Sequence, residues 1–216
     1  MNPDNPVVVL CSQGMQAEAE GRGADARALF LQAWETASDD YEACVAAHYL
    51  ARHQPTARDT LHWNRECLER ADRVGDDRVK GFYASLHLNM AKAHQDLGTP
   101  DLAREHFELA AARLRDLPAD QYADWIRLAA AEGLRSTGGI PPRPAADLLA
   151  SLLERLCELR DLRSLALILP SCLGDLGTPD DGIRLTTALH MLHASRTLPP
   201  AEQELLRQAV AVSAAP

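Results

Sequence analysis

The sequence predicts an all-α fold. Alanine and leucine, the strongest helix formers, dominate the chain, while β-branched residues are scarce outside the valine run at residues 7–9. Apolar side chains recur at the spacing of amphipathic helices, and breaks that contain glycine or proline separate the apolar segments. A chain of 216 residues is long enough to bury a sizeable core.

Helix-starting and helix-ending residues set the limits of the expected helices. Pro6 suits the first turn of a helix, and Gly21 suits the end of that helix because glycine tolerates the left-handed cap conformation. Thr178 is placed to cap a later helix, with Asp181 three positions on, and Pro170 is expected to kink or split the helix that contains it. The helices expected along the chain, ten to eleven in all, are 7–20, 25–37, 40–52, 57–74, a hairpin over 84–114 that turns at 98–100, 119–136, 145–159, 162–176, 179–196 and 200–213.

The strongest break in the chain is the segment 137–144, which contains two glycines and three prolines. It predicts a division into two parts. Residues 6–136 form the first set of helices. Residues 145–213 form C-terminal helical hairpins, which either cap that set or continue the same stack.

Two segments of the chain, residues 7–37 and 84–114, have small and aromatic residues at the same spacing. Each has a small residue in its first helix, a glycine at the turn, and alanine, phenylalanine and alanine along its second helix. The matching positions are Gly14 and Ala91, Gly21 and Gly98, Ala26 and Ala103, Phe30 and Phe107, and Ala33 and Ala110. This pattern resembles the tetratricopeptide repeat, a helical hairpin of about 34 residues.

The resemblance covers residues 7–114, with a divergent, longer unit between the two clear ones. The consensus tryptophan and tyrosine of the first helix and the closing proline are absent. The resemblance implies a right-handed superhelical stack of antiparallel helix pairs, an α-solenoid in which the first helix of each pair lines a concave groove. The groove positions that it implies include His48, Arg52, Asn89, Lys92 and Gln95.

Such a strip of residues is polar and partly basic inside an acidic protein. It suits a peptide carboxylate or acidic side chains, because asparagine and lysine donate hydrogen bonds and the cations match the charge. The first hypothesis is therefore a protein- or peptide-binding scaffold without catalysis. The first alternative is a ligand- or peptide-responsive regulatory subunit that works with a separate effector.

An all-α enzyme is the last alternative. The sequence contains no nucleophile elbow, phosphate-binding loop, dinucleotide-binding fingerprint or kinase signature. The eight histidines form no zinc-binding motif, and the acidic pairs fall at helix ends, where they stabilise the helix dipole. We therefore expect no catalytic residues, no metal and no cofactor.

Charge and cysteine usage limit the partners and the compartment. A net charge of −9 disfavours nucleic acid and anionic membrane surfaces, and no apolar run reaches the length of about 20 residues that spans a bilayer. The N-terminus lacks the features of a secretory signal, and five scattered cysteines without a CxxC pair are typical of buried thiols in a reducing compartment. We expect a cytoplasmic protein, with a homodimer possible through the leucine-rich C-terminal helices.

Overall fold

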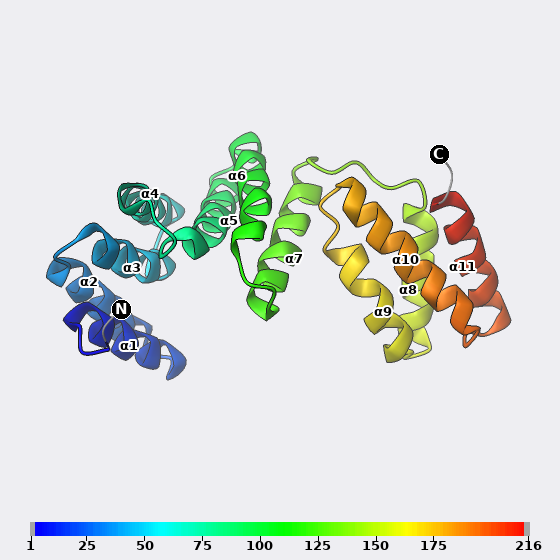
Figure 1. The fold of residues 1–216 in the computed structure, drawn as a ribbon, viewed down its shortest axis with the longest axis horizontal. Helices are drawn as coiled ribbons and strands as arrows, with labels where there is room; N and C mark the ends of the chain where they lie inside the picture. Colours follow the sequence, from blue (N-terminus) through cyan, green and yellow to red (C-terminus); the bar gives the residue numbers. More distant parts are fainter. Residues whose placement is uncertain (1–2, 214–216) are drawn as a thin grey trace. The chain divides into compact units, whose positions relative to one another are not determined.

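The chain folds into helices throughout the part that the structure, a computed structural model, describes (Figure 1), which is residues 3–213. In this range the regular elements are eleven α-helices and two short 3-10 helices, with no strand. The predicted all-α class is confirmed.

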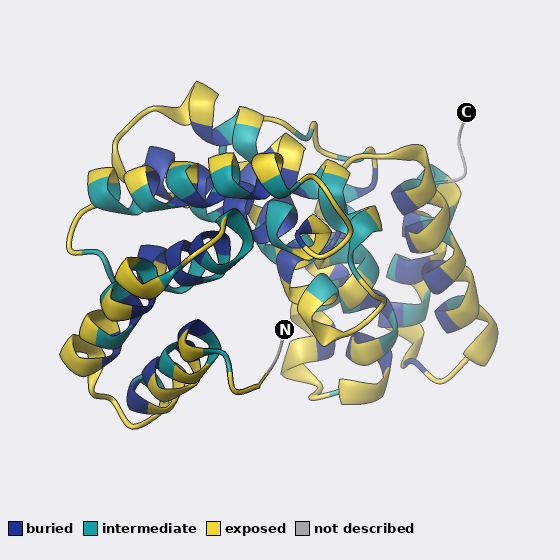
Figure 2. Cartoon of the chain, turned by 60° about the vertical axis from the view of Figure 1, so that its left-hand side comes forward, coloured by how far each residue is buried: buried dark blue, intermediate teal, exposed yellow. Residues whose placement is uncertain are grey.

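The helices follow the predicted order closely. Their bounds are α1 (Pro6–Ala19), α2 (Gly23–Thr36), α3 (Asp40–Leu50), η1 (Ala51–His53), α4 (Ala57–Val74), α5 (Lys80–Asp96), α6 (Pro100–Arg113), η2 (Leu114–Asp116), α7 (Gln121–Ser136), α8 (Ala146–Glu158), α9 (Leu162–Leu173), α10 (Pro179–Ser195) and α11 (Pro200–Ser213). Buried residues occupy one side of most helices and exposed residues the other (Figure 2), as amphipathic periodicity requires.

The chain divides into two compact units, unit 1 (Met1–Ile126) and unit 2 (Arg127–Pro216). The division falls within α7, whereas the sequence placed it at 137–144. The side chains on the two parts of α7 explain the difference. Trp125 contacts Lys92 of unit 1, while Arg127 and Arg135 donate hydrogen bonds to backbone carbonyls in the segment 173–175 of unit 2.

Unit 1 is built from consecutive helical hairpins. Helix α1 packs on α2, α3 on α4 and α5 on α6, and α2 and α4 then pack on the first helix of the next pair. The predicted hairpin at 84–114 is present, but its first helix begins one turn earlier, at Lys80. Val79, directly before that helix, is fully buried, so packing extends the helix beyond the segment that periodicity marks.

Small residues let α1 and α2 approach closely. A Cβ atom added to Gly14 would lie 2.7 Å from Cζ of Phe30 and closer still to Cε1, so only glycine fits against this ring. Phe30 is fully buried, as are Ala26 and Ala33 on the same helix face. The equivalent residues of α6, Ala103, Phe107 and Ala110, are at most 1% exposed. The shared spacing therefore marks the interface inside each hairpin.

Local signals at helix ends are borne out in most places. Gly21 and Gly98 both adopt positive φ angles, at 77° and 71°, which allow the chain to turn between paired helices. Thr178 and Asp181 form a complete capping box. Pro170 does not split α9, because it lies in the last turn and the helix ends at Leu173, before the predicted limit.

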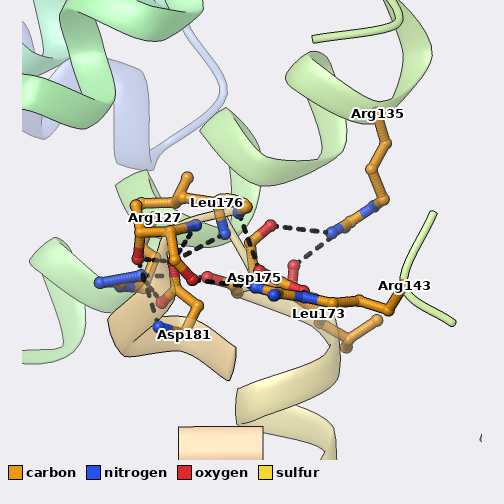
Figure 3. Close-up of polar contacts among 10 residues, drawn as sticks. Arg127, Arg135, Arg143, Leu173, Asp175, Leu176 and Asp181 are labelled. Atoms are coloured by element: carbon orange, nitrogen blue, oxygen red, sulfur yellow. Dashed lines mark hydrogen bonds and ion pairs between the residues drawn. The ribbon is translucent and has the colours of Figure 1, made fainter. Parts of the chain in front are cut away.

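Besides the end of α7, unit 2 contains four helices that contact one another in a ring: α8 with α9, α9 with α10, α10 with α11, and α11 with α8. Its core consists mainly of leucines contributed by all four helices. Two ion pairs, each between a half-buried arginine and a buried aspartate, lie at one end of this unit. Arg127 pairs with Asp181 at 2.9 Å and Arg143 with Asp175 at 2.7 Å (Figure 3).

We predict that Gly14→Ala lowers the free energy of unfolding of unit 1 by about 1–3 kcal/mol, because the new methyl group collides with the Phe30 ring. All three tryptophans lie in unit 1, so tryptophan fluorescence during urea unfolding reports on this unit. Gly81→Ala is the matched control, since nothing lies within 4 Å of the added Cβ, and we expect no loss of stability. Equal effects of the two substitutions would contradict the close approach.

Candidate functional site

A hollow of about 400 Å³ opens on unit 1 between the end of α3 and helix α5. It is lined by η1, by the loop that follows η1, by the first turn of α4 and by one face of α5. Three of the five predicted groove residues, Arg52, Asn89 and Lys92, lie in this lining together with Asp96. Gln54 also lines it, so the hollow gathers two cations, two side-chain amides and one carboxylate from segments far apart in the sequence.

Arg52 is held in place from two sides. Its guanidinium donates to the Glu18 carboxylate of α1 at 2.6 Å and lies 5.0 Å from the centroid of the Tyr49 ring. Glu18 also faces His53, with Nε2 and Oε1 3.4 Å apart. The side chain of Arg52 is thus oriented before any ligand arrives, and its charge is partly compensated.

Lys92 has a different environment. Its ammonium nitrogen lies 5.1 Å from the centroid of the Trp125 ring at the start of α7. Trp125 is 51% exposed and stacks on Tyr122, which is 43% exposed. Within residues 3–213, no carboxylate lies within ion-pair distance of Lys92. An exposed cation on an aromatic platform can therefore accept an external anion.

The other two predicted groove residues do not line the hollow. The ring of His48 packs against the rings of Phe82 and Tyr49, at centroid distances of 5.0 Å and 5.5 Å, inside the helix stack. Burial, with the nearby charge of Arg52, lowers the pKa of His48 to about 4, so this ring is neutral at pH 7. Gln95 is exposed on α5 and does not line the hollow, although its neighbour Asp96 does.

Three histidines form a column between α5 and α6, which the sequence did not indicate. His106 of α6 lies between His87 and His94 of α5, with ring centroids 5.4 Å apart on each side. Nδ1 of His87 lies 3.2 Å from Nδ1 of His106, and Nδ1 of His94 lies 2.9 Å from the Thr99 hydroxyl oxygen. His87 and His94 are seven residues apart, so helical spacing alone puts them on one face of α5, but it gives no signal for His106.

The column is electrically neutral at pH 7. Burial lowers the pKa of each of the three rings, and for His87 the neighbouring His106 and Arg113 add to the effect and bring the pKa to about 4. Across residues 3–213, no group of three or more histidine, cysteine, aspartate or glutamate side chains is arranged to hold a metal ion. We interpret the column as part of the packing between α5 and α6.

The cysteines follow the sequence expectation only in part. Cys11, Cys44 and Cys67 are buried in unit 1, and the sulfur atoms of Cys44 and Cys67 lie 3.6 Å apart. Cys157 is exposed, however, because it lies on the outer face of α8, away from the leucines of that helix that enter the core.

A scan of the sequence against models of known protein families finds no match, and searches of curated proteins and of solved structures find no similar chain. Over residues 3–213, no helix is both long enough and apolar enough to cross a membrane. The functional interpretation therefore depends on the geometry of the site.

We predict that acid destabilises unit 1 through His87. Its pKa is about 4 in the folded chain against an ordinary value of 6.5, so between these values the unfolded chain binds more protons. The contribution of His87 to the free energy of unfolding is fully present above pH 6.5 and is lost as the pH falls toward 4. This shift in the pKa corresponds to a loss of about 3 kcal/mol at most in the free energy of unfolding, and solvent screening reduces the loss toward about 1 kcal/mol.

Urea unfolding at pH 7 and pH 5, followed by tryptophan fluorescence, measures this effect. His87→Leu should show a smaller loss of stability between the two pH values than the natural chain. The exposed His62 of α4, replaced by glutamine, is the control and should leave the pH dependence unchanged. An unchanged pH dependence in His87→Leu would rule out this role for His87.

Proposed function

We propose that unit 1 is a protein-interaction module, organised as a tetratricopeptide-like right-handed superhelical stack, that binds an acidic peptide segment of a partner protein in the hollow between α3 and α5. The observation that carries this proposal is the convergence of Arg52, Asn89 and Lys92 in one hollow. In this proposal the chain acts by binding and not by catalysis.

The order of helix packing supports the stack. Each hairpin contacts the next through its neighbouring helices, and α1 also contacts α3, the first helix of the next pair. First helices that lie beside one another form a continuous inner surface in a solenoid. The functional side chains come from this set: Glu18 from α1, Asn89 and Lys92 from α5, with Arg52 directly after α3.

The chemistry of the hollow favours an anionic ligand. Lys92 offers a cation that lies beyond ion-pair distance of every described carboxylate, Asp96 of the same hollow included. Asn89 offers an amide donor, and Arg52 is pre-oriented by Glu18. Trp125 and Tyr122 add an exposed aromatic surface beside Lys92, and aromatic residues often anchor a peptide at an interface.

Fluorescence anisotropy with a library of labelled acidic peptides that carry a free carboxyl terminus tests the proposal. For the best-binding peptide, Lys92→Ala should weaken affinity about tenfold or more, because a charge-assisted hydrogen bond contributes about 1.5–3 kcal/mol. Asn89→Ala should weaken it by a smaller factor. Affinity should also decrease as salt concentration rises.

Arg27→Ala is the matched control, since Arg27 is an exposed cation on α2, away from the hollow. It should bind the peptide as the natural chain does. Binding that survives the double substitution Asn89→Ala and Lys92→Ala would refute the assignment of the hollow, as would a library in which basic peptides bind more tightly than acidic ones.

A further inference from the structure

Unit 2 contains a larger cavity than the hollow of unit 1, with a volume of about 570 Å³. This volume lies in the range of small-molecule binding sites, about 300–1,000 Å³. Its walls come from α8, from the end of α9, from α10 and from the loop before α8. The apolar residues that shape it include Ile140, Pro142, Leu149, Leu153, Leu173 and Leu185.

The cavity exists because α8 carries small residues on the face toward it. Ala146 and Ala150 lie one turn apart and line the cavity beside two leucines of the same helix, so they leave space that larger side chains would fill. The wall formed by Cys172 is chemically inert, since burial raises the pKa of its thiol to about 11. The interior therefore offers apolar contacts and no reactive group.

The loop that borders the cavity is fixed in place. Arg143 donates to both carboxylate oxygens of Asp175, at 2.7 Å and 2.8 Å, and to the carbonyl oxygen of Thr178 at 3.0 Å. Ile140 packs against Gly177, where an added Cβ would lie 3.2 Å from Cγ2 of the isoleucine. A site whose rim is already ordered loses less entropy when a ligand binds.

One end of the cavity carries a net positive charge, because its lining contains two arginines, Arg135 and Arg143, and one aspartate, Asp175. Figure 3 shows the polar contacts of these three residues. Burial tends to raise the pKa of Asp175, but hydrogen bonds from Arg143 and from the Gly177 amide outweigh it and keep the carboxylate ionised. Arg143 is the ion-pair partner of Asp175, and the charge of Arg135, which lies beyond ion-pair distance, also lowers the pKa of this carboxyl group. Among the described residues, the acceptors of Arg135 are the carbonyl oxygens of Leu173, at 2.9 Å, and Asp175, at 3.4 Å.

Within residues 3–213, no carboxylate lies within ion-pair distance of Arg135. A guanidinium has five N–H donors, and two carbonyl contacts leave others available to a ligand. Arginine is also suited to hold a carboxylate with two parallel hydrogen bonds. The uncompensated charge of Arg135 at the edge of an apolar cavity selects an anionic head group attached to an apolar chain.

We propose that this cavity is a binding site for an aliphatic carboxylate, with its hydrocarbon chain between α8 and the 140–142 loop and its carboxylate on Arg135. The apolar walls exclude strongly polar ligands, and the charge of Arg135 disfavours cations. This site is separate from the peptide hollow of unit 1, and the proposal does not depend on whether that hollow binds peptide.

Isothermal titration calorimetry on the full chain, with octanoate, octan-1-ol and octylammonium, tests the head-group preference. We expect octanoate to bind in the sub-millimolar range, at least tenfold more tightly than octan-1-ol, with octylammonium weakest. The heat-capacity change should be negative, as burial of apolar surface requires. Binding of octylammonium or octan-1-ol as tight as that of octanoate would overturn the proposal, as would no binding of octanoate.

Variants locate the site. Arg135→Gln should weaken the binding of octanoate at least tenfold, because its carboxylate loses its partner. The affinity for octan-1-ol should change by no more than about twofold. Ala150→Phe, at an exposed position of α8, should weaken both ligands by filling the cavity. Arg184→Gln, an exposed arginine of α10, is the control and should bind as the natural chain does. Octanoate binding that survives both Arg135→Gln and Ala150→Phe would place the ligand elsewhere and refute the proposal.

Discussion

The close approach of α1 and α2 at Gly14 and Phe30 is the constraint on which the geometry of unit 1 depends. Phe30 fills the space that the absent Gly14 side chain leaves, and its ring also stacks on Tyr49 of α3, with centroids 5.3 Å apart. Tyr49 in turn supports Arg52 at the edge of the hollow. A continuous set of contacts therefore links the interior of the first hairpin to the proposed binding residues. Because interiors are close-packed, a shift at Gly14 would be transmitted to Arg52.

Unit 2 achieves its stability differently. Helices α8 to α11 close into a ring around leucines. One ion pair joins α7 to α10, and a second joins the loop before α8 to the loop after α9. Asp181 is 3% exposed and accepts hydrogen bonds from Arg127, from the Thr178 hydroxyl and from two backbone amides. A buried carboxylate needs such partners, since an unpaired charge inside a protein is strongly destabilising. The Arg143–Asp175 pair also holds the rim of the cavity, where Arg135 has no ion-pair partner among the described residues.

Features set by near neighbours in the chain could be predicted from the sequence. The hairpin spacing, the glycine turns and the capping box of Thr178 and Asp181 each depend on residues within a turn or a hairpin. Features set by contacts between distant segments could not. The position of His106 between two histidines depends on how α6 rotates against α5, and the pairing of Arg143 with Asp175 joins residues far apart in sequence.

The same distinction explains the mixed outcome for the site. Asn89 and Lys92 lie on consecutive turns of one helix, so periodicity alone indicates that they share a face, and the hollow contains both. His48 and Arg52 are also one turn apart, but the His48 ring packs against Phe82, whereas Arg52 is exposed. Periodicity shows which residues share a face. It does not show which edge of that face a neighbouring helix covers.

A double-mutant cycle between Gly14 and Phe30 tests the central constraint most directly. Leucine at position 30 lacks the Cε1 and Cζ atoms that lie closest to Gly14, so Gly14→Ala should cost much less stability in the Phe30→Leu background than in the natural chain. The account predicts a coupling energy of about 1 kcal/mol or more between the two positions, measured by urea unfolding. Effects that add to within about 0.5 kcal/mol would contradict it.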